Sequence, residues 1–354
     1  MSKSSSKSKN IGIPIADLAL LNSSDTDLES SGKFLEIWDY AFRTFGFICL
    51  INHGLEENYR LLHAEIQRFF QLPLGEKLKF RIAADYGHGG YIPQGQENVS
   101  RTFLEDEKAR SPYAVESLAS SKSNYDSFPC IENGYHNDDL KNLSLELEVG
   151  LDYLSIKVME IMARCLELPN DYFLDFYKDG RAVNNIRFAH YLRVEKGQEG
   201  KQQRYGEHTD YTGFTFLWRS SDNGLQCFNT SGDFNSGDIH ADLGRNQWIN
   251  ILTLKEHPDA LIVNAGDLIQ RWTNDYWISN IHRVLGNGRN EEADQENVSG
   301  PISIVFFTGP KGDTKIRVLS QSEKVSSKGP INDKYREEVT AEEHLWLKIN
   351  ASNK

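Results

Sequence analysis

The chain has 354 residues, a net charge of -12 and 39% hydrophobic residues. This length allows two domains at roughly 100–200 residues each, and the apolar content is sufficient for a sizeable core. The acidic balance argues against a nucleic-acid partner, which needs a basic surface to neutralise phosphates, and it disfavours an anionic membrane surface.

The cysteines and the N-terminal residues indicate in which cellular compartment the protein is expected. Cys49, Cys130, Cys165 and Cys227 are far apart, with no Cys-x-x-Cys pair, so they indicate neither a zinc site nor a disulfide framework. No run of about 18 apolar residues predicts a membrane span. The basic start of the chain lacks an apolar segment behind it, so we expect no secretory signal. A reduced, cytoplasmic location follows.

The first half of the chain is predicted to be mainly helical. Residues 1–10 are polar and of low complexity, which predicts a disordered tail. Apolar residues at helical spacing predict helices over 34–45 and 58–70, separated by a short buried strand, Phe47–Ile51. A long helix is predicted over 140–168, where Pro169 stops it.

Residues 84–135 differ from their surroundings. They are rich in Gly, Ser, Asn and Pro and have little periodicity. A long irregular segment in a compact protein is usually functional or disordered. Loops on a rigid scaffold carry specificity, so we expect substrate contacts here.

The second half is predicted to be β-rich. Short strand signals follow one another with turns between them, which is typical of a barrel or jelly roll rather than of βαβ units. The runs are Ile186–Leu192, Phe214–Trp218, Leu225–Phe228, Trp248–Leu252, Leu261–Val263 and Ile302–Phe307. Polar insertions occupy 231–246 and 287–300, and Thr340–Glu343 fits a capping box for a last short helix.

We therefore expect a mainly β protein with a helical flank and a double-stranded β-helix (jelly roll) core. The expected division is a tail at 1–10, a helical leader at 11–135, a scaffold helix at 136–182, the jelly-roll domain at 183–320, and a C-terminal tail and helix at 321–354.

One short motif carries chemistry. His208 and Asp210 lie two positions apart where a strand is predicted, so the two side chains would share a face. An imidazole and a carboxylate are two-thirds of the facial triad that holds non-haem Fe(II). The motif alone arises often by chance. His282, in the strand-like run 279–284, is the candidate third ligand, although a lone histidine there is more commonly a core residue.

Several motifs in the same order resemble a known family. The chain resembles the isopenicillin-N-synthase-like branch of the Fe(II)/2-oxoglutarate-dependent dioxygenases, from Ile13 to about Leu319. The matching stretches are Ile13–Leu18, Phe45–Gly54, Phe69–Pro73, Tyr91–Pro93, His208–Asp210, Gly224–Gln226, Val263–Trp272 and Ser279–Val284.

The resemblance implies a function. It implies that His208, Asp210 and His282 bind Fe(II), and that 2-oxoglutarate and O2 are used to hydroxylate or otherwise oxidise a small organic molecule. It further implies that Tyr191 and Ser303 lie near the cosubstrate.

The chain departs from the family at one important position. The family carries Arg-x-Ser on the last barrel strand, and its arginine grips the distal carboxylate of 2-oxoglutarate; here Ser303 matches but Pro301 replaces the arginine. Arg219, Arg271 and Arg289 are possible sources of a cation. Two alternatives stay open: an iron-dependent oxidase that does not use 2-oxoglutarate, and a catalytically silent binding protein of the same fold. The sequence indicates neither the substrate nor the oligomeric state.

Overall fold

The structure, a computed structural model, has two facing sheets at its centre. It describes residues 12–22, 28–81, 90–96, 113–120, 137–178, 182–192, 203–221, 224–229, 248–251, 255–285 and 300–352. Within these residues the larger sheet has the order β1-β2-β10-β7-β12-β5-β4-β3, and the smaller sheet has the order β6-β11-β8-β9. All neighbouring strands in these two sheets are antiparallel, except β1 and β2, which are parallel.

The elements have the following bounds. The strands are β1 Ile15–Asp17, β2 Phe47–Ile51, β3 Gly90–Ile92, β4 Val115–Ser120, β5 Ala182–Tyr191, β6 Gln203–His208, β7 Phe214–Arg219, β8 Leu225–Phe228, β9 Trp248–Asn250, β10 Leu261–Ala265, β11 His282–Leu285, β12 Ile302–Lys311, β13 Lys315–Ile316 and β14 Val339–Thr340. The helices are α1 Ala19–Asn22, α2 Leu28–Thr44, α3 Glu56–Phe70, α4 Leu74–Lys77, α5 Asn137–Cys165, α6 Leu174–Tyr177, α8 Asp267–Trp272, α9 Glu323–Ser326 and α10 Ala341–Ser352, with 3-10 turns η1 Leu78–Phe80 and η5 Asp333–Tyr335.

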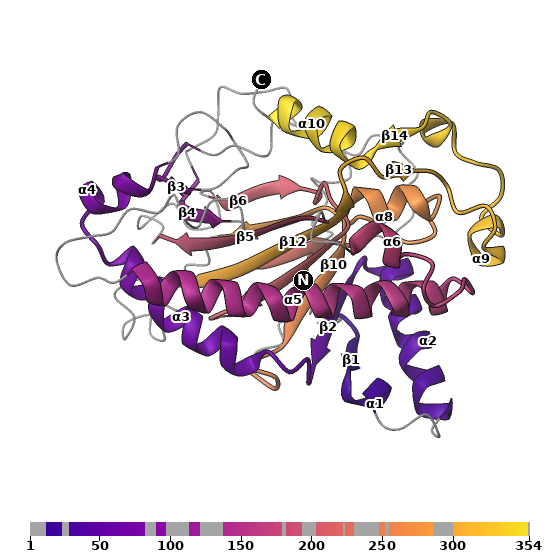
Figure 1. Ribbon diagram of the computed structural model, residues 1–354, viewed down its shortest axis with the longest axis horizontal. Helices are drawn as coiled ribbons and strands as arrows, with labels where there is room; N and C mark the ends of the chain where they lie inside the picture. The colour runs from indigo at the N-terminus through magenta and orange to yellow at the C-terminus, as the bar shows by residue number, and fades with distance from the viewer. Residues whose placement is uncertain are drawn as a thin grey trace, which may run out of the picture.

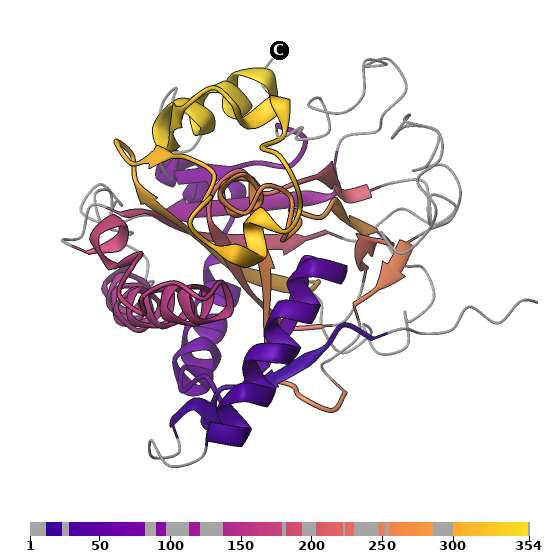
Figure 2. The same cartoon turned by 90° about the vertical axis from the view of Figure 1, so that its right-hand side faces the viewer.

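Helices cover one face of the larger sheet. The long helix α5 runs across that face beside α3, and α2 packs near one end of α5 (Figures 1 and 2). The core between them joins Trp38 of α2, Ile66 of α3 and Leu151 of α5 to alternate residues of the strands, among them Phe216 and Phe306. Because side chains alternate along a strand, the intervening residues face the opposite way.

The other face of the larger sheet packs against the smaller sheet. Cys49 and Ile262 of the larger sheet share a buried cluster with Leu225, Cys227 and Val284 of the smaller one. The two layers therefore enclose an interior, and the fold is the expected jelly roll with a helical flank. Strands β1 and β2 come from the leader region, so this region contributes directly to the same sheet.

Most predicted elements are confirmed, with shifted ends. The strand Phe47–Ile51 is confirmed at both ends. The helix predicted over 140–168 is α5, and it ends at Cys165. It ends there because Glu167 adopts a φ of 57° and the Leu168 N–H returns to the Ala163 carbonyl at 2.9 Å, a C-terminal cap that breaks the helical ladder.

The capping box is also confirmed. The Thr340 N–H donates to Oε2 of Glu343 at 2.8 Å, and the Glu343 N–H donates to Oγ1 of Thr340 at 3.2 Å. The helix that follows, α10, is therefore fixed at its first turn. No helix in the described part of the chain has the length and apolarity needed to cross a bilayer.

Several of the predicted segments fall wholly or partly outside the residues that the structure describes. The tail at 1–10, the insertion at 231–246 and residues 287–299 of the second insertion lie outside the described residues. Within 84–135 the described parts contribute the short strands β3 and β4 to the edge of the larger sheet. The five-part division of the chain stays a prediction.

Candidate active site

His208 and His282 meet at the ends of two paired strands. His208 is the last residue of β6 and His282 the first residue of β11, and the two are direct partners in the antiparallel register. Their ring centroids lie 4.1 Å apart. The predicted approach of His282 to the motif is therefore confirmed, and it results from the pairing of two strands that are distant in the sequence.

Asp210 completes the cluster, though not in the way the sequence predicted. The expectation that His208 and Asp210 share one strand face is wrong, because β6 ends at His208 and Asp210 lies in the connection to β7. The chain turns there and brings the carboxylate back. Oδ1 of Asp210 lies 3.7 Å from Nε2 of His208 and 3.7 Å from Nε2 of His282. The three ligand atoms lie within 4.8 Å of one another.

Backbone carbonyls orient both imidazoles. Nδ1 of His208 lies 2.8 Å from the Gly206 carbonyl, and Nδ1 of His282 lies 3.1 Å from the Asn280 carbonyl. A carbonyl only accepts, so each Nδ1 carries the proton and each Nε2 presents its lone pair. Both lone pairs therefore belong to the nitrogens that face Asp210. This is the usual arrangement of histidines that bind a metal, since the second nitrogen is fixed by a hydrogen bond.

Two side chains hold the other oxygen of Asp210. Oγ1 of Thr215 donates to Oδ2 at 2.5 Å, and the amide of Asn264 donates to the same atom at 2.6 Å. Oδ2 is occupied, so Oδ1 is left facing the histidines. Thr215 and Asn264 lie on adjacent strands β7 and β10 as direct partners. Neither role was predicted from the sequence; Asn264 lies within β10, beyond the predicted strand end at Val263.

Burial sets the charge of the cluster. Burial and the neighbouring His282 lower the pKa of His208 to about 3, so its imidazole is neutral at pH 7. Burial alone would raise the pKa of Asp210, but His282, His208, Thr215 and Asn264 outweigh it and hold that pKa below its usual range. Neutral imidazole nitrogens and one carboxylate oxygen are the donors that divalent iron accepts, and the set fits such an ion.

Aromatic rings surround the histidines. Phe47 meets the His282 ring edge-on at 5.3 Å between centroids, and Tyr205 meets the His208 ring at 4.9 Å. The Arg187 guanidinium lies over the Tyr205 ring at 5.0 Å and donates to its hydroxyl at 3.1 Å. These contacts limit the ring orientations of both histidines.

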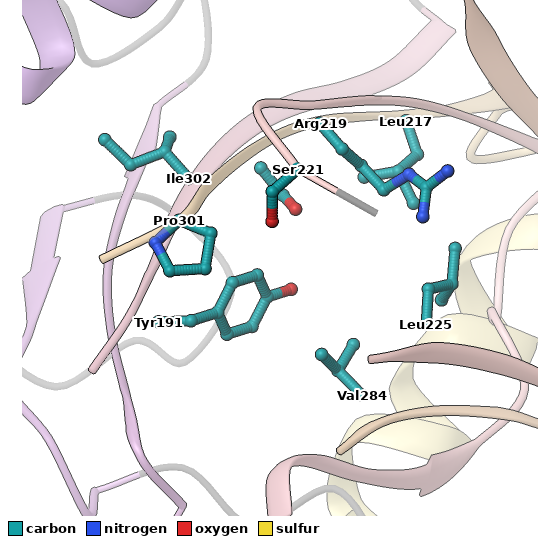
Figure 3. A pocket seen from close by; sticks show the side chains of 9 residues that line it. Tyr191, Leu217, Arg219, Ser221, Leu225, Val284, Pro301 and Ile302 are labelled. Atoms are coloured by element: carbon teal, nitrogen blue, oxygen red, sulfur yellow. The ribbon is translucent and has the colours of Figure 1, made fainter. Parts of the chain in front are cut away.

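A cavity lies alongside this cluster in the interior of the jelly roll. The residues that line it are Tyr191, Leu217, Arg219, Ser221, Leu225, Val284, Pro301, Ile302 and Ser303. In Figure 3 the Tyr191 ring and the Arg219 side chain reach the cavity from two different strands, β5 and β7, and Pro301 lies beside Tyr191. The cavity adjoins the histidines through Val284, two residues beyond His282 on β11.

The structure brings Tyr191 and Ser303 together in this cavity. Their hydroxyl groups are hydrogen-bonded, and burial raises the pKa of the Tyr191 phenol. Arg219 is the direct register partner of Ser303, on the neighbouring strand β7. Arg271 is elsewhere: its Nε donates to the Ile316 carbonyl, and it fixes the C-terminal segment. Arg289 lies outside the described residues.

Comparisons with known proteins place these features in one family. Residues 13–126 match the family model described as non-haem dioxygenase in morphine synthesis N-terminal, and residues 183–310 match that of the 2OG-Fe(II) oxygenase superfamily. The chain belongs to the Fe(II)/2-oxoglutarate-dependent oxygenase superfamily.

Individual members of this oxygenase superfamily are similar over most of the chain. Gibberellin 20 oxidase 1 of Arabidopsis thaliana is 28% identical over 306 residues, which cover 86% of this chain and 71% of that protein. Proline hydroxylase buaE of Petromyces alliaceus is 28% identical over 313 residues, covering 85% and 88%. A full-length Neurospora crassa protein, solved as a crystal structure in complex with alpha-KG, has a TM-score of 0.74 and 25% identity, and the match covers 99% of each chain.

The comparisons settle the class of the protein. It is an Fe(II)- and 2-oxoglutarate-dependent oxygenase, and the neighbouring structure with bound alpha-KG supports 2-oxoglutarate as the cosubstrate. The two alternatives left open by the sequence, an oxidase without 2-oxoglutarate and a silent binding protein, are not favoured.

Proposed function

We propose that His208, Asp210 and His282 hold Fe(II), and that Tyr191 and Ser303 contact 2-oxoglutarate, in an oxygenase that hydroxylates or otherwise oxidises a small organic molecule. The observation that carries the proposal is the convergence of two imidazole Nε2 atoms on Oδ1 of one carboxylate, each at 3.7 Å. All three side chains are at most slightly exposed, so the site is shielded from bulk water.

The three candidate ligands supply the protein's side of the iron coordination. When bound, Fe(II) with O2 and 2-oxoglutarate supplies the oxidising power for a C–H bond, while 2-oxoglutarate is converted to succinate and CO2. His208 and His282 offer their imidazole Nε2 atoms, and Asp210 offers one oxygen because Thr215 and Asn264 occupy the other. Three protein donors on one side leave the remaining coordination positions for small ligands.

The relatives and the cavity both favour a small substrate. The relatives are named for gibberellin oxidation and proline hydroxylation, and one neighbouring structure holds thymine. These are small organic molecules of different chemistry. The cavity beside the ligand cluster is lined by the Tyr191 and Ser303 hydroxyls and by the Arg219 guanidinium, which are polar groups that suit a small anionic cosubstrate. We therefore assign the chain a small-molecule substrate and no nucleic acid.

A titration tests the metal and cosubstrate parts. Fe(II) is added anaerobically, then 2-oxoglutarate, and the weak visible metal-to-ligand band is recorded together with succinate formation in air. We expect the band in the wild type and its loss in His208→Ala, with His257→Ala as a matched control outside the ligand cluster. Iron binding without a band and without succinate would contradict the 2-oxoglutarate assignment.

We also propose a cytoplasmic location. Cys49, Cys165 and Cys227 are buried free thiols, which suits a reducing compartment. The acidic net charge of -12 disfavours attraction to anionic lipids. A fluorescent fusion found at a membrane or in the secretory pathway would contradict this location.

A further inference from the structure

The cosubstrate has two charged ends, and the cavity must accommodate the second. One end of 2-oxoglutarate, its 2-oxo acid group, suits the metal. Its other carboxylate then lies several atoms away, inside a buried cavity. Loss of hydration strongly disfavours a carboxylate that has no partner in such a place. A guanidinium is the side chain best matched to it, because its fork of N–H groups binds both oxygens.

Position 301 does not supply this partner. Pro301 lines the cavity but has neither charge nor N–H. Its carbonyl is already used, since it accepts from the Tyr191 N–H at 2.9 Å. Among the described residues that line the cavity, Arg219 alone has a charged side chain.

Arg219 is held in the interior by the alternation of β7. Phe214, Phe216 and Trp218 face the helices and belong to the helix-side core. Thr215, Leu217 and Arg219 therefore face the jelly-roll interior. Thr215 touches the candidate iron ligand Asp210 at one end of this row, and Arg219 lies at the other, roughly 13 Å away along the strand at ~3.3 Å per residue. An arginine side chain and a five-carbon dicarboxylate together span such a gap.

The surroundings of Arg219 suit an anion. The residue is 5% exposed, and its Nη1 donates to the Ile251 carbonyl at 3.1 Å, an uncharged acceptor that orients the guanidinium. Ser303, its register partner, and Tyr191 add hydroxyl groups from the next two strands of the same sheet, β12 and β5. In Figure 3 the guanidinium and the Tyr191 hydroxyl both lie at the cavity.

We propose that Arg219 of β7 binds the distal carboxylate of 2-oxoglutarate, so that the cation of the cosubstrate pocket has moved from the last long strand, β12, to the strand beside it. The inference rests on the proposed function. Tyr191 and Ser303 keep their places on β5 and β12, and the arginine reaches the same carboxylate from β7, the other neighbour of β12 in the same sheet.

The test compares two 2-oxo acids. 2-Oxoglutarate has the distal carboxylate and 2-oxobutyrate lacks it, so the ratio of their affinities measures what binds that group. Both are titrated anaerobically into Fe(II)-loaded protein, with the visible band as readout. In Arg219→Leu we expect the Kd for 2-oxoglutarate to rise about 30-fold or more while the Kd for 2-oxobutyrate stays within about 3-fold. Arg336→Leu, a change at an exposed arginine, is the matched control.

A second variant gives a rescue. Pro301→Arg is added to Arg219→Leu, and tighter binding of 2-oxoglutarate is expected because the new guanidinium enters the same cavity. If Arg219→Leu does not fold, Arg219→Gln is used, and the ratio of the two affinities still reports on the distal carboxylate. An unchanged ratio in a folded, iron-loaded variant overturns the inference.

The outcomes separate the two proposals. A wild type that binds iron but gives no band with either acid overturns the proposed function. A wild type that binds 2-oxoglutarate, with Arg219 variants that bind it equally well, overturns only the role of Arg219. Arg204 is also buried and acts electrostatically on Tyr191, so Arg204→Leu is measured in parallel. Loss of the affinity ratio there, and not in Arg219→Leu, would assign the anchor to Arg204 instead.

Discussion

The amide of Asn264 donates to Oδ2 of Asp210 at 2.6 Å, and this contact decides which carboxylate oxygen faces the histidines. With Thr215 on the same atom, Oδ2 has two donors and Oδ1 remains available. The orientation of the acidic ligand is thus set by residues that do not themselves touch the metal position.

Asn264→Ala tests this orientation. Loss of one donor lets the carboxylate rotate, so we expect iron affinity to fall about 10–100-fold, the usual effect of removing a group that orients a metal ligand. Isothermal titration with Fe(II) under anaerobic conditions measures it. Asn332→Ala, at an exposed position, is the control. Equal affinity in both variants would show that Thr215 alone is sufficient.

Gly266→Ala tests how closely two loops approach. A Cβ at Gly266 would lie 2.4 Å from the Thr212 carbonyl oxygen and 2.8 Å from that of Gly213, so the connection after Asp210 must shift. We expect about 1–3 kcal/mol loss in the free energy of unfolding and weaker iron binding. Gly75→Ala has nothing within 4 Å of the new carbon and is the control. Chemical denaturation and iron titration measure both variants, and a fully stable Gly266→Ala would contradict the close approach.

Lys348→Met tests the link between helix α10 and the active site. Nζ of Lys348 lies 2.7 Å from Oδ2 of Asp267, and the Asp267 N–H donates to the Asp210 carbonyl at 2.8 Å. Burial alone would raise the pKa of Asp267, but His344, Lys348 and Ser279 outweigh it and set that pKa at about 2. Without Lys348 the buried carboxylate loses a close cation, so we expect a loss of about 1–3 kcal/mol in stability.

Thermal unfolding measures this effect. Lys328→Met, a change at an exposed lysine of the C-terminal segment, serves as the comparison. If the two variants unfold at the same temperature, Lys348 does not stabilise Asp267.

Glu116→Gln tests a buried network on the helix side of the larger sheet. Glu116 accepts from Lys77 and His190, each at 2.7 Å, and also from Tyr91. Burial alone would raise the pKa of Glu116, but these hydrogen bonds outweigh it and hold that pKa below its usual value of 4.5. The variant leaves the buried Lys77 uncompensated, so we expect a loss of roughly 3–5 kcal/mol at pH 7.

The sign of the pH dependence follows from the lowered pKa. The stabilisation from ionised Glu116 is complete above the unfolded value of about 4.5 and is lost as the pH falls through the lower folded value. The difference between wild type and Glu116→Gln should therefore narrow below about pH 4.5. Glu256→Gln is the exposed control. A difference that stays constant from pH 7 to pH 3 would contradict the network.

The sequence identified the three candidate ligands because their residue types and order survive in a recognisable pattern. Its reason for pairing His208 with Asp210 was wrong, because strand periodicity says nothing about where a strand ends. That end depends on the pairing of β6 with β11, a contact between distant segments.

The direction of Arg219 was also beyond the sequence alone. Alternation predicts that it shares a face with Thr215, but which face is interior depends on where α5 and α3 pack. The aromatic residues at 214, 216 and 218 were a usable signal, since all three belong to the helix-side core. The sequence shows that the family's arginine is absent at position 301. It does not show that Arg219, on another strand and much earlier in the chain, is the residue proposed to replace that arginine.

The position of α10 has a consequence for biosynthesis. Asp267, next to the ligand loop, receives a cation from Lys348, which leaves the ribosome well after both candidate histidines. Until that late segment has emerged and docked, Asp267 lacks the close cation that stabilises its buried carboxylate. The Asp267 N–H donates to the Asp210 carbonyl, so we expect the connection that carries the acidic iron ligand to reach its full stability only once α10 has been synthesised.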